Sequence, residues 1–76
     1  MDIRWVDGFE IVTGVREGEV TIYANREGLL SLANILFDLA SESPGTHIHL
    51  DEHNSLEQGS SGLIIERIDE GRLEGA

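Results

Sequence analysis

The sequence predicts a small α+β domain in which a four-stranded, mostly antiparallel sheet carries one helix on one face, in the order β-β-α-β-β. Three observations support this fold class. The chain has 76 residues, enough for one hydrophobic core and no second domain. Four short segments rich in β-forming residues come in two pairs, and one long apolar segment separates the pairs. We therefore expect a single domain over residues 1–70 and a disordered tail over residues 71–76.

The first pair of strands is predicted from two segments joined by a glycine-containing turn. Residues 9–15 read FEIVTGV, the turn contains REG, and EVTIYA follows at residues 19–24. Alternation places Val20, Ile22 and Ala24 on one side, as expected for a hairpin. Residues 3–5 either extend the first strand or lie across the edge of the sheet.

The helix is predicted from Arg26 to about Glu42. Asn25 offers a side-chain acceptor to the first turn, and Glu27 lies where the helix dipole favours an acid. Pro44 disfavours the α conformation of the residue before it, so the helix should end close to this position.

Apolar residues occupy well over half of the predicted helix circumference, which is wider than one sheet face requires. Two kinds of covering are possible. The first is another part of the same chain: Trp5, the sheet edge or the C-terminal tail. The second is a separate molecule, either a different protein or a second copy of the chain in a homodimer. The polar residues form only a narrow stripe, and the apolar set is Leu29, Leu30, Leu32, Ala33, Ile35, Leu36, Phe37, Leu39 and Ala40.

The second pair of strands is predicted from THIHLD at residues 46–51 and GLIIERI at residues 62–68, with a polar loop between them. Side chains alternate across a strand, and Ile48 and Leu50 must face the core. His47 and its neighbours at positions 49 and 51 should therefore lie on the sheet face away from the helix.

The stretch HIHLDEH at residues 47–53 raises the question of a metal site. His47 and His49 could share one zinc ion, because a strand places them side by side. Asp51 lies about 13 Å from His47 along an extended strand, which is too far for a shared metal. His53 would need the chain to turn back. We therefore expect no metal site, and His47 and His49 are the ligands if one exists.

The favoured interpretation of these histidines is a polar, partly solvated strand face packed against neighbours such as Thr21 and Tyr23. Other catalytic patterns are weak as well. The serines near EQGSSG precede a strand, whereas a nucleophile elbow requires a following helix. The chain contains no lysine that could reach a phosphate. We expect neither enzymatic activity nor a cofactor.

The charge of the chain limits its partners. Fifteen acidic residues and five arginines give a net charge of −10, which repels nucleic acid and anionic lipid and attracts basic proteins. No segment approaches the roughly 20 apolar residues of a membrane span. The start of the sequence lacks the features of a secretory signal, and cysteine is absent. We therefore expect a cytoplasmic protein.

Three short motifs carry a resemblance to a known family. They are GLLSLA at the start of the helix, HIHLD in the third strand, and LEQGS before LII in the fourth. In this order, the segment from Gly28 to Ile68 resembles the immunity protein 32 family of bacterial polymorphic toxin systems. The resemblance implies a small cytoplasmic protein that neutralises a cognate toxin by binding it, and it implies no catalytic residue.

The residues themselves favour the same function. A nuclease toxin needs a cationic cleft to hold phosphate, and an acidic surface can occupy such a cleft. Residues 51–76 hold seven acids and two arginines, and we expect Asp51, Glu52, Glu57 and Glu66 to form the contact edge. The alternative for any one of them, an ordinary solvated acid, is the commoner case. Two other classes stay open: a small metal-binding enzyme that uses the histidines, and a homo-oligomeric structural module.

Overall fold

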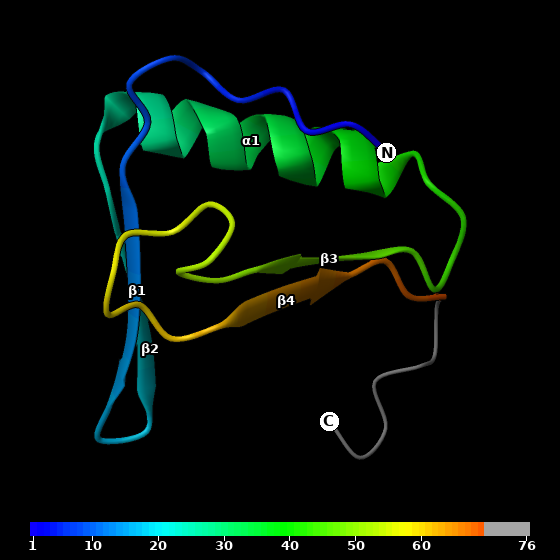
Figure 1. Ribbon diagram of the computed structural model, residues 1–76. Helices are drawn as coiled ribbons and strands as arrows, with labels where there is room; N and C mark the ends of the chain where they lie inside the picture. The colour runs from blue at the N-terminus through cyan, green and yellow to red at the C-terminus, as the bar shows by residue number, and fades with distance from the viewer. Residues whose placement is uncertain (70–76) are drawn as a thin grey trace.

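The computed structural model describes residues 1–69 and confirms the predicted order of elements. The elements are β1 (Ile11–Arg16), β2 (Glu19–Ala24), α1 (Arg26–Ala40), β3 (His47–Leu50) and β4 (Leu63–Glu66). Helix α1 lies along the β3–β4 hairpin, whereas the β1–β2 hairpin runs in a different direction at the end where α1 begins (Figure 1). The predicted tail at 71–76 lies outside the described residues.

The strands form two separate two-stranded antiparallel sheets, β1–β2 and β3–β4, so the prediction of one four-stranded sheet is wrong. The reason lies at the free edge of β1, which a loop occupies. The backbone N–H of Glu57 donates to the Ile11 carbonyl at 2.9 Å, and that of Ser61 donates to the Thr13 carbonyl at 3.0 Å. The Thr13 N–H donates to the Ser60 hydroxyl oxygen at 3.2 Å. These bonds satisfy the edge of β1, and no position is left there for a strand.

The β1–β2 turn shows why this hairpin has the predicted register. Glu17 has φ of 52° and Gly18 has φ of 80°, and two consecutive positive φ values are typical of the type I′ turn of two-residue hairpins. The turn pairs Val15 with Val20 and, further along, Val12 with Tyr23.

Helix α1 begins as predicted. The Asn25 side-chain oxygen accepts a hydrogen bond from the Gly28 N–H at 2.7 Å, which is the N-cap arrangement. The helix ends at Ala40, two residues before the predicted end, and the N–H of the C-cap residue Ser41 donates to the Asp38 carbonyl at 3.1 Å.

The hydrophobic core lies where the inner face of α1 meets β3–β4 and the start of β1. Burial of this set supplies most of the driving force for folding in so short a chain. In the β3–β4 hairpin, Ile48 pairs with Ile65 and Leu50 with Leu63, and both pairs face inward. The core cluster consists of Ile11, Leu32, Ile35, Leu50 and Leu56.

The N-terminal segment runs along α1, so residues 3–5 neither extend β1 nor cross the sheet edge (Figure 1). It binds the polar stripe of the helix. The Val6 N–H donates to the Ser31 hydroxyl oxygen at 2.9 Å, and the Asn34 amide donates to the carbonyl of residue 4 at 2.9 Å. The Arg4 guanidinium pairs with Asp38 at 2.7 Å, and its hydrogen bond holds the pKa of that carboxyl below its ordinary value.

Because its polar stripe is covered, α1 presents an apolar face to solvent. Leu29 is 57% exposed, Leu36 53% and Phe37 74%. The covering predicted from Trp5 reaches only part of the helix circumference: Trp5 packs at the border of the core and stacks on Phe9, with ring centroids 4.4 Å apart.

Candidate functional site

The structure places the HIHLDEH stretch partly as predicted. Leu50 is buried and Ile48 half-buried, while His47 and His49 are exposed on the opposite side of β3. Their cross-strand partners are not Thr21 and Tyr23, which belong to the other hairpin. His47 lies opposite Glu66, and His49 lies opposite Ile64.

The histidines and neighbouring acids do not converge. The closest approaches are 3.9 Å from His49 Nε2 to Asp51 Oδ2 and 3.8 Å from His53 Nε2 to Glu52 Oε1. Over residues 1–69, no group of three or more histidine, cysteine, aspartate or glutamate side chains is placed to hold a metal ion.

Instead, the acids at positions 51 and 52 shape the loop between β3 and β4. The Asp51 carboxylate accepts from the His53 N–H at 2.9 Å, and its backbone carbonyl accepts from the Leu56 N–H at 2.9 Å. The Glu52 carboxylate accepts from the Gly59 N–H at 2.6 Å. Leu56 is 4% exposed and anchors the loop in the core. The loop is therefore held on both of its sides, by the core and by β1.

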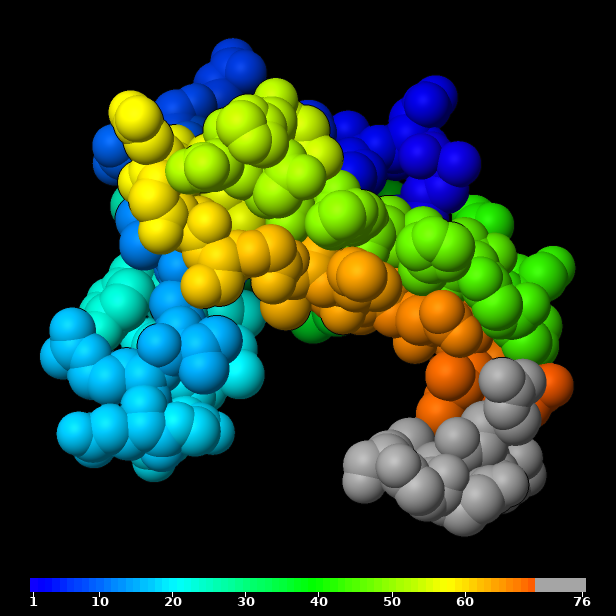
Figure 2. All heavy atoms as spheres, turned by 60° about the horizontal axis from the view of Figure 1, so that its bottom comes forward, coloured from blue at the N-terminus to red at the C-terminus, as the bar shows by residue number. Residues whose placement is uncertain are grey.

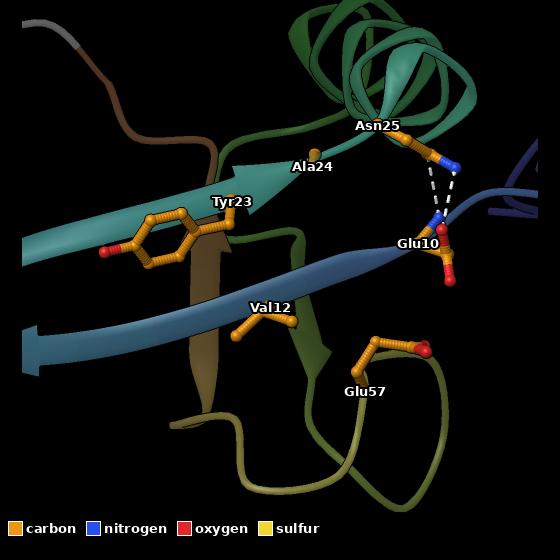
Figure 3. A pocket seen from close by; sticks show the side chains of 6 residues that line it. All are labelled: Glu10, Val12, Tyr23, Ala24, Asn25 and Glu57. Atoms are coloured by element: carbon orange, nitrogen blue, oxygen red, sulfur yellow. Dashed lines mark hydrogen bonds between the residues drawn. The ribbon is translucent and has the colours of Figure 1, made fainter.

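An open hollow of about 330 Å³ lies where this loop meets the β1–β2 hairpin (Figure 3). One wall comes from the hairpin and the chain just beyond it, and the other comes from the loop. The lining residues are Glu10, Val12, Tyr23, Ala24, Asn25 and Glu57.

Hydrogen bonds fix both acids of the hollow through the backbone. Asn25, the N-cap residue of α1, accepts from the Glu10 N–H at 3.0 Å and donates from its amide to the Glu10 carboxylate at 3.3 Å (Figure 3). Glu57 is held by the bond from its N–H to the carbonyl of Ile11. The cap of α1, the start of β1 and the loop thus meet at one place.

The hollow combines two carboxylates with apolar surface. Within the described part of the chain, neither Glu10 nor Glu57 forms an ion pair. Tyr23 is 64% exposed and Val12 is 37% exposed, so an aromatic and an aliphatic side chain line the same hollow as the two carboxylates. A hollow lined by carboxylates and an accessible aromatic ring suits a guanidinium or ammonium group.

The four acids expected at a contact edge do not lie together. Glu57 lines the hollow, Asp51 and Glu52 lie earlier in the same loop, and Glu66 lies on β4 opposite His47. Sequence reasoning did not single out Glu10 or Tyr23. The available signal was the two-residue turn, which fixes the pairing of Val12 with Tyr23 and places both on the outer face of the hairpin.

A second exposed surface lies on the inner face of the same hairpin, where it projects beyond the rest of the molecule. Figure 2 shows a concave surface between this hairpin, in blue and cyan, and β4, in orange. Val15, Val20 and Ile22 follow the buried residues Ile11 and Thr13 on one face of the hairpin, and all three are at least 43% exposed.

These features define a class of protein: a small acidic α+β domain with exposed apolar surface and an open carboxylate-lined hollow. Over the described residues, no helix has the length and apolar character needed to span a membrane. The chain belongs to the immunity protein 32 family, because the family model described as Immunity protein 32 matches residues 19–68. The match covers β2, α1, β3 and β4 and begins after β1. Neither a curated protein nor a solved structure matches the chain.

Proposed function

We propose that this protein is a non-enzymatic immunity protein of the cytoplasm that binds a cognate bacterial toxin and blocks its basic active site with an acidic surface. The observation that carries the proposal is the match of the Immunity protein 32 model over residues 19–68. The charge of the chain and the chemistry of the hollow support it.

Charge favours a basic partner and repels others. With a net charge of −10, the protein attracts a cationic cleft over a distance of about one Debye length, which is about 8 Å at physiological salt. Such attraction raises the association rate more than it slows dissociation. The same charge opposes binding to nucleic acid and to anionic membranes.

The hollow supplies a place for a specific anchor. A lysine or arginine side chain of the toxin can enter it, with its charge between Glu10 and Glu57 and its aliphatic stem against Val12 and Tyr23. An arginine that normally holds the phosphate of a toxin substrate would be neutralised there. A toxin arginine that packs against Tyr23 of this protein would be such an anchor, because arginine and tyrosine are enriched among the few residues that dominate binding energy at an interface.

The other acids contribute around this anchor. We propose that Asp51 and Glu52 form a rim next to Glu57, because all three belong to one ordered loop. Glu66 lies on β4 and would contact a partner large enough to reach beyond the loop. The apolar face of α1 is a different surface, so a homodimer through the helix is compatible with toxin binding.

The first test is capture of the partner. The untagged chain is coupled to a resin by its N-terminal amine, exposed to lysate of the cells that produce it, and washed at low and then moderate salt. We expect one basic toxin domain at equal stoichiometry, released as salt rises. Recovery of no protein, or stoichiometric zinc in the purified chain, would overturn the proposal.

A pair of matched variants tests the proposed surface. The double variant Glu10→Gln/Glu57→Gln removes two charges from the hollow, and Asp2→Asn/Glu42→Gln removes two charges elsewhere. The first should weaken toxin binding by about tenfold or more, and the second should change it by only a few fold through the loss of long-range attraction. Equal losses would show that the hollow is not the contact.

A further inference from the structure

The exposed face of α1 carries a regular pattern that lies outside the surface proposed for the toxin. Leu29, Ala33, Leu36 and Ala40 are spaced by four, three and four residues, which is the spacing of the a and d positions of a heptad. Leu29 and Leu36 are more than half exposed, and both alanines are exposed. We call these four residues the α1 seam.

The α1 seam is complementary to itself in one orientation only. When two copies of the helix run antiparallel, Leu29 faces Ala40 of the second copy, and Ala33 faces its Leu36. Every layer then joins one large side chain and one small one, which fills space evenly and lets the helices approach closely. A parallel pair would place leucine against leucine and alanine against alanine, so that overpacked layers would alternate with underpacked ones.

The residues beside the seam agree with the antiparallel orientation. Leu30 is 39% exposed and Phe37 is 74% exposed, and both lie on the same side of the α1 seam. In the antiparallel pair, Leu30 of each copy would contact Phe37 of the other. Between Arg26 and Ser41 the only charged residues are Glu27 and Asp38, and Asp38 is paired with Arg4 beneath the N-terminal segment. No acid therefore lies within the α1 seam, although the chain is strongly acidic.

Charge at the helix ends favours the same arrangement. Arg26 lies at the start of α1, where it pairs with Glu27 at 3.6 Å while its side chain stays 78% exposed, and the last turn of the helix contains no basic residue. In the antiparallel pair, Arg26 lies next to the last carbonyl groups and Glu42 of the second copy. A cation at a helix C-terminus is favourable, because the unpaired carbonyls carry partial negative charge.

We propose that the α1 seam is a homodimer interface in which two copies of α1 pack antiparallel, with Ala33 of each copy against Leu36 of the other. This proposal does not rest on toxin binding. A helix of 15 residues is about 22 Å long, and an interface of that length is small beside the roughly 1,200–2,000 Å² of stable complexes. We therefore expect association in the micromolar range.

Salt separates this association from toxin binding. Two chains with a charge of −10 each repel one another, and salt screens that repulsion. Dimerisation should therefore strengthen as salt rises, whereas capture of a basic toxin should weaken. The failure of one proposal can thus be told from the failure of the other.

The orientation is tested by disulfide trapping, which the absence of native cysteine makes possible. The variants Ala33→Cys and Leu36→Cys are mixed in equal amounts and oxidised under mild conditions. The antiparallel register predicts a mixed disulfide between the two variants in excess over either homodisulfide, since Cα atoms must lie within about 7 Å to be bridged. Predominant homodisulfides would overturn the register.

Sedimentation or light scattering over about 5–500 µM measures the association itself. Leu36→Asp should raise the dissociation constant at least about tenfold, whereas Ile64→Asp, at a 62% exposed position on β4, should leave it unchanged. Circular dichroism measures whether each variant folds. A monomer at every concentration would overturn the proposal. A loss of folding in Leu36→Asp would point instead to a covering by the chain's own residues.

Discussion

Replacing Gly28 by alanine tests how closely the helix and the first strand approach one another. Gly28 is buried in the first turn of α1, and a Cβ atom there would lie 2.4 Å from the Glu10 carbonyl oxygen and 3.0 Å from Ile11 Cγ1. Close carbon–oxygen contacts normally lie at about 3.3–3.6 Å. The chain at Glu10 would have to move by about 1 Å to admit the methyl group.

Two opposing effects set the size of the change. Alanine favours a helix over glycine by about 1 kcal/mol. Overpacking costs about 1–3 kcal/mol, and the displaced Glu10 carbonyl is the acceptor for the Asn25 N–H at 3.2 Å, a bond that contributes about 1 kcal/mol. We expect a net loss of about 1–3 kcal/mol in the free energy of unfolding, which is a large part of the stability of so small a domain.

Urea unfolding followed by circular dichroism and by the fluorescence of the single tryptophan measures this loss. Gly14→Ala is the matched control, because a Cβ atom at that position meets nothing within 4 Å, and it should be neutral or slightly stabilising. A Gly28→Ala variant as stable as the parent would contradict the close contact between α1 and the start of β1.

Three further changes probe the N-cap of α1 and the contacts that hold the N-terminal segment on the helix. Asn25→Ala removes the N-cap acceptor and the bonds to residues 8 and 10, so it should lower the free energy of unfolding by about 1–2 kcal/mol in a urea titration; no change would argue against the cap. Ser31→Ala leaves the N–H of Val6 without its acceptor and should lower the free energy of unfolding by about 1–3 kcal/mol. The fluorescence of Trp5 should shift as the N-terminal segment loosens, and an unchanged spectrum would contradict this contact. Asp38→Asn tests the ion pair with Arg4. The hydrogen bond from Arg4 lowers the pKa of Asp38 in the folded state below its ordinary value of 3.8. The ion pair therefore stabilises the fold at pH values above 3.8, and this stabilisation is lost as the pH falls through the folded-state pKa. The difference in urea midpoint between parent and variant should therefore be present at neutral pH and vanish in acid, and a difference independent of pH would contradict this cause.

Local sequence signals predicted the elements well. The N-cap at Asn25, the end of the helix before Pro44 and the inward direction of Ile48 and Leu50 all follow from short-range rules about capping and alternation. The register of the first hairpin is likewise fixed by its two-residue turn. Each of these features depends on residues that are close together in the sequence.

Long-range backbone pairing could not be predicted in the same way. The loop that bonds to Ile11 and Thr13 has no strand periodicity, so nothing in its composition indicated that it would occupy the edge of β1. The polar stripe of α1 was also ambiguous, because serine and asparagine bind water and backbone groups equally well. Only the structure shows that Ser31 is fully buried beneath the N-terminal segment.

The candidate site follows the same division. Glu57 was expected at a contact edge because residues 51–76 hold seven of the fifteen acids. The local hairpin register places Tyr23 beside Val12. Glu10 and Glu57 reach the same hollow only because the loop bonds to the start of β1, a contact between Ile11 and Glu57, which lie 46 positions apart in the sequence. The carboxylate pair therefore depends on the fold rather than on a local motif.

Titration of the captured toxin with the purified protein is the most direct measurement of the central claim. Inhibition by binding predicts that toxin activity falls in proportion to the protein added and reaches its minimum at one equivalent, with the complex intact afterwards. Full toxin activity at an excess of the protein would contradict the claim. Loss of activity at a small fraction of one equivalent would contradict it as well, because it would require turnover.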